Sequence, residues 1–253
     1  MIDTHTHLYS EEFKTDQHEM IQRAIAAGVL KMMMPAIDSN YIAPMLQLQQ
    51  QYPQHCFAMA GLHPCYVKEN VADELLKVQT MLQQKNVVAI GETGLDFYWD
   101  TTFKAAQYQS LQQHIEWAIN FKLPLILHTR NATQETIDVI TAHKHPDLKG
   151  IFHCFGGSVE EAQQIIDLGF LLGIGGVLTY KNAGLDVVLK EIDMVHIVLE
   201  TDAPYLAPVP KRGKRNESAY LPFVAQKLAD IKEIDINDVI NITTNNAEKL
   251  FKV

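Results

Sequence analysis

Residues 1–7 read MIDTHTH and residues 87–92 read VVAIGE, and each is a short apolar run that ends in side chains able to bind a metal ion. Residues two apart on a β-strand point to the same face, so the imidazoles of His5 and His7 can reach one ligand. Neutral histidine is the commonest metal ligand in proteins. A histidine pair alone is a weak signal. The recurrence of ligand-type side chains at the ends of later apolar runs predicts both a fold and a site.

Short apolar runs of this kind recur along the chain, separated by stretches with helical spacing. The runs cover residues 1–4, 29–36, 56–61, 87–91, 124–127, 150–152, 170–173 and 197–200. Helices are expected over residues 11–27, 40–51, 70–85, 103–121, 132–144, 158–168 and 183–193. Continuous runs rich in Val, Ile and Leu are typical of parallel strands covered on both faces. The alternation predicts an α/β fold, a TIM (β/α)8 barrel.

A doubly wound sheet is the structural alternative, but it would not gather six side chains from several strand ends around one point. After the eighth run, residues 203–216 are rich in proline and basic side chains and are expected to form a loop. Two C-terminal helices are expected over residues 217–231 and 236–251, with Asp235 as the better N-cap of the second. Residues 1–253 contain no linker or low-complexity tract, and we interpret them as a single domain.

Composition narrows the class of protein. The 253 residues are 47% hydrophobic, which suffices for a sizeable core, and no apolar stretch approaches the roughly 20 residues of a membrane span. The first residues already form strand and site, so we expect no signal peptide and a cytoplasmic location. Three cysteines do not suggest a disulfide framework. A net charge of −9 argues against a protein that coats DNA, but not against a nuclease with a local basic patch.

Side chains of metal-ligand type stand at or just after the ends of several runs. They are His5, His7, Glu92, His128, His153 and Asp202. In a barrel, the C-terminal ends of the strands line the active-site face. Any one of these residues could be a hydrogen-bonded polar group at a strand end, but burying all of them unpaired would be very costly. Together they predict a catalytic metal centre.

The number of these residues exceeds what one tetrahedral zinc ion needs and suits two cations ~3.5–4 Å apart. The simplest assignment gives one cation His5, His7 and Asp202. It gives the other His128 and His153, with Glu92 as the bridge. Such a pair lowers the pKa of a shared water and yields a bridging hydroxide near neutral pH. We expect Asp202 to act as general base, and magnesium, manganese and zinc stay open.

Residues 211–217 read KRGKRNE, the one dense basic cluster of an acidic chain. A solvated loop is the plain interpretation. Barrels, however, often build phosphate sites after the last strands, and guanidinium groups match phosphate geometry. We therefore expect Lys214 and Arg215 to contact an anionic substrate, and Asn216 and Glu217 to anchor the loop.

Further side chains near the predicted mouth are expected to assist the site. His63 ends the third run, and we expect it to support the metal ligands or contact a phosphate more readily than to be a ligand itself. Arg130 and Asp96 follow two of the ligands and are expected to orient them or to contact substrate. The aromatic residues 97–99 could stack on bases or simply pack within a loop.

The order of these motifs resembles the TatD family of metal-dependent hydrolases, which are amidohydrolase-like. The matching stretches are DTHTHL (3–8), GLHP (61–64), GETGLD (91–96), HTR (128–130), HCFGG (153–157), ETDAPYL (200–206) and GKRNE (213–217). The resemblance implies a TIM barrel and supports the six ligands with Glu92 as the bridge. Cys65, Asn131, Lys211 and Ser218 depart from the family's usual residues. None of them is an expected ligand, so substrate choice rather than metal binding is affected.

The resemblance also implies a deoxyribonuclease, including activity of the 3′→5′ exonuclease type. We expect DNA as the substrate, single-stranded or at 3′ ends, with no membrane and no obligate protein partner. The alternative is a binuclear metal hydrolase of an amide, lactone or aminoacyl ester in a small molecule, because the same hydroxide serves either chemistry. A nucleic-acid-binding or metal-storing protein without activity is a further alternative, which the intact ligand set disfavours.

Overall fold

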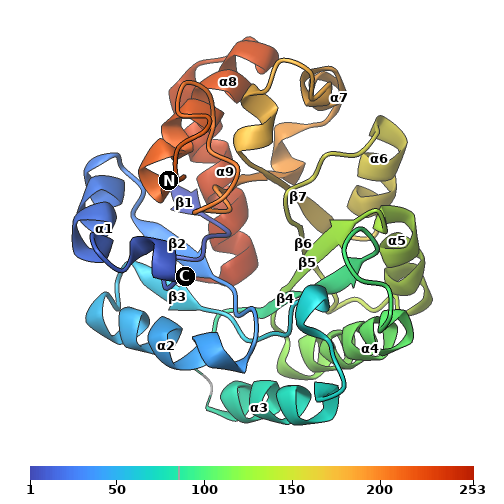
Figure 1. Ribbon diagram of the computed structural model, residues 1–253. Helices are drawn as coiled ribbons and strands as arrows, with labels where there is room; N and C mark the ends of the chain where they lie inside the picture. The colour runs from blue at the N-terminus through green and yellow to red at the C-terminus, as the bar shows by residue number, and fades with distance from the viewer. Residues whose placement is uncertain (85) are drawn as a thin grey trace.

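The computed structural model describes residues 1–84 and 86–253, and within them eight strands form a ring in the middle of the molecule (Figure 1). The strands are β1 Ile2–Asp3, β2 Lys31–Met34, β3 Cys56–Ala58, β4 Ile90–Asp96, β5 Leu125–Arg130, β6 Gly150–Phe152, β7 Phe170–Ile174 and β8 Ile197–Leu199. Each overlaps one of the predicted apolar runs, although β4 and β5 extend several residues beyond the predicted ends. All paired neighbours are parallel, as continuous apolar strands require.

Hydrogen bonds join the two edges of the strand array into a closed barrel. Strands β1–β3 and β4–β8 form two hydrogen-bonded sheets. At one seam the Thr4 amide donates to the Leu199 carbonyl at 3.1 Å, and at the other the Gly91 amide donates to the Ala60 carbonyl at 2.8 Å. Closure confirms the predicted TIM barrel and rules out the doubly wound sheet, which has two free edges.

Helices connect the strands along the chain, and all but the last lie around the outside of the ring (Figure 1). They are α1 Gln17–Ala26, α2 Ile42–Gln51, α3 Val71–Gln83, α4 Lys104–Phe121, α5 Thr133–Ala142, α6 Val159–Asp167, α7 Leu185–Glu191, α8 Leu221–Lys232 and α9 Ile236–Phe251. The expected helix over residues 70–85 ends earlier, and its last residue, Lys85, lies outside the described residues. Helix α8 begins later than expected because a 3-10 turn precedes Pro222, whose ring suits the first turn of a helix.

The barrel interior has an apolar floor at the N-terminal ends of the strands. It is built from one inward-pointing residue on or beside most of the strands together with the end of helix α9. The buried members are Ile2, Met33, Met59, Ala89, Ile126, Ile151, Val198, Ala247, Leu250 and Phe251. Helix α9 accordingly lies within the outline of the ring in Figure 1. The last helix therefore closes the lower end of the barrel.

Local sequence explains where this closing helix begins. The Asp235 side chain accepts a hydrogen bond from the Asn237 amide at 2.7 Å, which confirms Asp235 as the N-cap of α9. A second apolar core fills the space between the outside of the barrel and the surrounding helices. In the described part of the chain, no helix has both the length and the apolar character of a membrane span.

Candidate metal centre

The carboxylate of Glu92 lies in the middle of a cluster at the C-terminal end of the barrel, and its side chain is only 3% exposed. Strand β4 carries it there, directly after the seam with β3. Its Oε2 atom lies 3.1 Å from Nε2 of His5 and 3.8 Å from Nε2 of His7. Both histidines follow strand β1, as the sequence predicts. The first strand therefore directs two imidazoles at one carboxylate oxygen.

The second oxygen of Glu92, Oε1, is surrounded by three more imidazoles. It lies 3.0 Å from Nε2 of His153, 3.0 Å from Nδ1 of His128 and 3.4 Å from Nε2 of His63. These histidines come from the ends of strands β6, β5 and β3. The sequence favoured a supporting or phosphate-contacting role for His63, yet its Nε2 lies closer to Glu92 than that of the expected ligand His7, which is 3.8 Å away.

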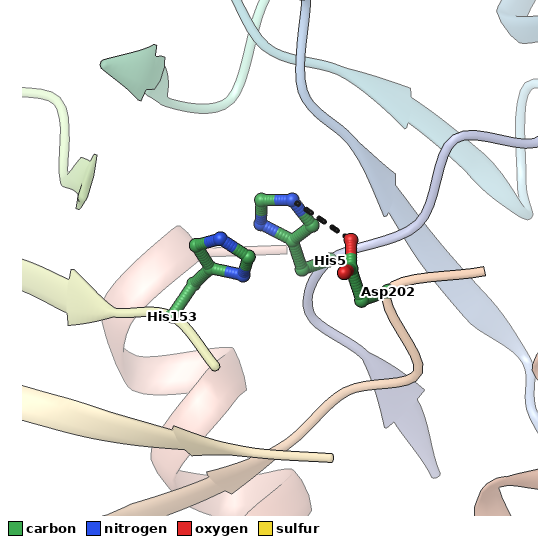
Figure 2. Close-up of side chains that lie close together, drawn as sticks. All are labelled: His5, His153 and Asp202. Carbon is green, nitrogen blue, oxygen red and sulfur yellow. Dashed lines mark ion pairs between the residues drawn. The ribbon is translucent and has the colours of Figure 1, made fainter. Parts of the chain in front are cut away.

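Asp202 joins the cluster from the end of strand β8. Its Oδ1 lies 3.4 Å from Nε2 of His7 and 3.8 Å from Nε2 of His5. Its amide donates to the His5 carbonyl at 2.9 Å, and its φ of 56° is one that aspartate tolerates better than most residues. Figure 2 shows His5 between Asp202 and His153. The rings of His5 and His153 are stacked, with their centres 3.8 Å apart. The first, sixth and eighth strands thus converge on one point.

Further polar groups contact the second ring nitrogen of three of these imidazoles, the one that does not face Glu92. Nε2 of His128 lies 2.9 Å from Asp96, Nδ1 of His153 lies 3.3 Å from Glu200, and Nδ1 of His7 lies 2.8 Å from the Tyr9 hydroxyl. Partners of this kind set the tautomer and orientation of metal-binding histidines. Sequence analysis anticipated an orienting role for Asp96 but missed Tyr9 and Glu200. The sequence did contain a signal for Glu200, because this carboxylate ends the apolar run over residues 197–200.

The fully buried Glu200 side chain requires two special features of the backbone around it. Its Oε1 accepts a hydrogen bond from the Cys154 amide at 2.6 Å. Strand β7 passes so close that a Cβ atom on Gly173 would lie 2.3 Å from Glu200 Oε2. Only glycine leaves room for the carboxylate at that position. The glycine-containing strand β7 thus makes the space in which Glu200 reaches His153.

The electrostatics of the cluster favour ionised carboxylates. Burial raises the pKa of Glu92, but the imidazoles of His63, His153 and His5 outweigh it and hold that pKa well below its usual range. Burial likewise raises the pKa of Asp202, whereas the hydrogen bond to His7 and the nearby His153 lower it, with a net decrease. Ionised carboxylates are the form that binds cations.

Two histidines respond to the same field in opposite directions. Burial lowers the pKa of His5, which therefore stays neutral. Burial also acts to lower the pKa of His153, but Glu92 and Glu200 on either side raise it well above its ordinary value. Because a metal ligand must be deprotonated, cation binding at His153 would release a proton.

The donor atoms fit divalent cations. Within the described residues, three sets of ligand atoms lie within 4.8 Å of one another: His5 with His153 and Asp202, His5 with His7 and Glu92, and His63 with Glu92 and His128. Mixed imidazole and carboxylate donors suit zinc and manganese, and the overlap of the sets through Glu92 and His5 suits more than one ion. The residues could therefore hold a metal.

A cavity of about 770 Å³ opens over the cluster. Glu92, His128, His153 and Asp202 lie along its lining, as do two of the predicted substrate contacts, His63 and Arg130. A volume of this size is within the ~300–1,000 Å³ typical of ligand pockets. The cavity joins the ionisable cluster to a region that a substrate can enter.

The basic loop does not line the cavity, since neither Lys214 nor Arg215 is among its lining residues, and their contact with substrate stays a prediction. The guanidinium of Arg215 instead binds both carboxylate oxygens of Asp16 at 2.7 and 2.8 Å, and Lys214 is exposed. The reason is a nearby carboxylate on the segment before α1 that the sequence alone does not connect to this loop.

The anchoring roles of the next two residues are confirmed. The Asn216 side chain donates to the carbonyls of Thr201 and Tyr205 at 2.8 and 2.7 Å. Glu217 forms an ion pair with Arg23 at 2.6 Å. These contacts fasten the loop beside the chain that carries Asp202.

A closed barrel with buried histidines and carboxylates at its C-terminal mouth defines the class of barrel-type metal-dependent hydrolases. Comparison with known families agrees: the family described as TatD related DNase matches residues 2–252. The chain belongs to this TatD-related family, and it is a metal-dependent hydrolase.

Individual relatives span the whole chain. The uncharacterized metal-dependent hydrolase YabD of Bacillus subtilis is 36% identical over 100% of this chain and 99% of its own length. The 3′-5′ ssDNA/RNA exonuclease TatD of Yersinia pseudotuberculosis is 32% identical, with 100% of each chain covered. Among solved structures, the TatD homolog YJJV of Escherichia coli superposes with a TM-score of 0.94 at 30% identity, covering 100% of this chain and 98% of that one.

Proposed function

We propose that this hydrolase is a deoxyribonuclease that removes nucleotides from the 3′ ends of DNA, single-stranded ends in particular. The observation that carries the proposal is the buried Glu92 carboxylate ringed by imidazoles at the base of a cavity that also contains the Arg130 guanidinium. A cationic side chain beside a cation-binding cluster suits an anionic phosphodiester. The exonuclease name of one full-length relative supports the same substrate.

Two divalent cations are part of the proposal. His5, His7 and Asp202 would hold one of them, His128 and His153 the other, and Glu92 would lie between the two. His63 is a further candidate for the second cation, since its Nε2 is 3.4 Å from Glu92. Bound cations of this kind polarise a phosphoryl oxygen and lower the pKa of a water molecule.

Asp202 is proposed as the general base. Its pKa is lowered, so it is ionised at neutral pH, and at 14% side-chain exposure it faces the cavity. In the reaction, water oxygen bonds to phosphorus while the bond from phosphorus to the 3′ oxygen of the preceding nucleotide breaks. Asp202 accepts a proton from the water, and the departing oxygen takes one from solvent.

Arg130 is proposed to hold the substrate phosphate. Its side chain is exposed at the end of β5, two residues after His128, and it lies along the cavity wall. A guanidinium presents several N–H groups in a plane, which suits bidentate contact with phosphate oxygens. It is the predicted substrate contact whose position best fits that role.

The direct test is release of nucleotides from single-stranded DNA with a labelled 5′ end, after removal of metal ions and after their return. Progressive shortening from the 3′ end that needs added metal is the expected result. Glu92→Gln provides the control, because it keeps the shape of the side chain and removes its charge. Equal release by the mutant, or none by the wild type under any metal, would defeat the nuclease proposal.

A small-molecule hydrolase is the second candidate, and the position of Arg215 favours it. That guanidinium is engaged by Asp16 rather than free at the mouth, which leaves less positive charge for a long polyanion. The salt dependence of KM separates the candidates. For a nuclease, Lys214→Gln should reduce the slope of log affinity against log salt by up to about 1. For an enzyme of neutral esters or amides, that substitution and salt should matter little.

A further inference from the structure

Two large aromatic side chains stand exposed on the loop that follows strand β4. Trp99 is 66% exposed and Tyr98 is 52% exposed, whereas the preceding Phe97 packs against the core. Exposed aromatics are costly to keep in water, and adjacent ones commonly mark a binding surface. Trp99 also lines the cavity above Glu92. The loop therefore presents apolar ring surface beside the ionisable cluster.

Arg130 completes this group from the neighbouring strand. Its guanidinium carbon lies 4.0 Å from the centre of the Tyr98 ring and 5.1 Å from that of Trp99, and the two rings meet edge to face at 4.8 Å. A guanidinium stacked on an aromatic face keeps its N–H edge available for an anion. Ring faces and anion donors thus lie side by side, which is the arrangement a nucleotide needs.

The group is tied to the candidate metal centre through Asp96. One oxygen of Asp96 accepts the amides of Tyr98 and Trp99 at 2.9 and 3.1 Å, and the other lies 2.9 Å from Nε2 of His128. The Phe97 amide also donates to the Arg130 carbonyl at 2.9 Å. The same carboxylate therefore positions both a candidate ligand and the aromatic pair.

We infer that Tyr98, Trp99 and Arg130 form a stacking site for an unpaired nucleobase at the 3′ end of the substrate. This inference rests on the proposed nuclease function and narrows its substrate to nucleic acid with a single-stranded end. Aromatic stacking tolerates every base, because each has a π-face, but it requires a base that is free of its duplex partner. Arg130 would then contact the phosphate next to the stacked base.

A two-by-two comparison tests the contact between Trp99 and a base. Wild type and Trp99→Ala are each given an oligonucleotide with an intact 3′ end and one whose two 3′-terminal nucleotides lack bases. For the wild type, KM for the intact end should be about tenfold lower than for the abasic end. Trp99→Ala should raise KM for the intact end toward the abasic level and leave kcat nearly unchanged, because uniform binding is lost while Tyr98 remains.

Control variants separate stacking from a general disturbance of the loop. Trp99→Phe keeps a ring and should restore most of the difference between the two substrates. Val187→Ala removes apolar surface from a residue of helix α7 that is equally exposed, at 66%, and should change neither KM. A difference between intact and abasic ends that is undiminished in Trp99→Ala would overturn the inference.

Tryptophan fluorescence gives a readout that does not need turnover. The chain has two tryptophans, and the other, Trp117, is buried on helix α4. In Trp117→Phe the emission of Trp99 should be quenched by a single-stranded oligonucleotide without added metal, and much less by a blunt duplex or an abasic strand. If Trp117→Phe does not fold, the wild type with Trp99→Phe subtracted reports the same signal.

The two measurements distinguish the failure of this inference from that of the proposed function. Quenching by unpaired bases without any hydrolysis of DNA would defeat the nuclease and keep a nucleobase site. Hydrolysis with the same KM for intact and abasic ends, and no quenching, would overturn the stacking site and keep the nuclease. The absence of both quenching and hydrolysis would contradict both the stacking site and the nuclease proposal.

Discussion

The two ends of the barrel are built from the same strands but differ in chemistry. At the mouth, the imidazole nitrogens of several histidines lie 3.0–3.8 Å from the carboxylate of Glu92. At the floor, inward-pointing side chains such as Met33 and Ile126 pack against the end of helix α9 and contribute only apolar atoms. The mouth concentrates charge that is costly to bury, and the floor supplies apolar burial that offsets such costs. Function and stability are thus divided along the barrel axis.

The largest effect on the mouth is expected from Glu92→Gln. Loss of the central charge should reduce metal-dependent turnover by at least about a hundredfold, since even groups behind the ligands are worth 10–100-fold. The folded state should persist, because glutamine fills the same space. Steady-state hydrolysis and near-UV circular dichroism together check this. A turnover near that of the wild type would mean that the cluster does not perform the reaction.

The matching change at the floor is Phe251→Ala. This buried ring closes the barrel from below, and its removal should lower the free energy of unfolding by about 3–5 kcal/mol. Turnover per folded molecule should be unaffected, since the ring lies at the opposite end from Glu92. Urea denaturation measures the free energy of unfolding. Val195→Ala, a substitution at an exposed apolar residue, serves as the neutral control. A large loss of turnover in the folded mutant would contradict the division between the ends.

A smaller effect on the mouth is expected from Glu200→Gln. This carboxylate lies 3.3 Å from Nδ1 of His153 and should act by orienting that imidazole. We expect a loss of about 10–100-fold in metal affinity or activity, with the apolar floor unchanged. Gly173→Ala should produce a similar loss, because its Cβ would lie 2.3 Å from Glu200. Metal titration by calorimetry checks both, and an unchanged affinity in both would remove the positioning role.

The pH dependence of stability should reveal His114, which lies just behind the mouth. Its Nε2 accepts a hydrogen bond from the Leu62 amide at 3.1 Å, and burial lowers its pKa to about 4. Above the unfolded-state pKa of about 6.5, both states are neutral and the full stability is present. As the pH falls toward 4, the unfolded chain takes up the proton first, and about 3 kcal/mol of stability is lost.

Urea denaturation at a series of pH values measures this loss. His114→Gln can still accept the Leu62 hydrogen bond through its amide oxygen but cannot be protonated. It should therefore be less sensitive to acid over the same range, with the other titrating groups common to both proteins. Identical pH profiles for the two proteins would contradict the assignment.

The strand-end positions of the candidate site were predictable because they follow from local pattern. An apolar run that stops at His153 or Glu92 identifies both a strand and its C-terminal end, and barrel geometry then brings such ends together. The N-cap at Asp235 was predictable for the same reason, since capping involves residues close in sequence. Contacts between distant segments were not. The pairing of Arg215 with Asp16 joins residues that only the closed barrel brings together.

The amino-acid order alone determined the alternation of strands and helices and the identity of the polar groups at the strand ends, because periodicity and residue type are local properties. Tertiary structure decided which of those groups meet. It brought the Nε2 atom of His63 closer to Glu92 than that of His7, placed Glu200 beside Nδ1 of His153, and positioned Arg130 over the ring of Trp99. These contacts depend on the tilt and closure of the barrel, which place residues from different strands within a few ångströms of one another.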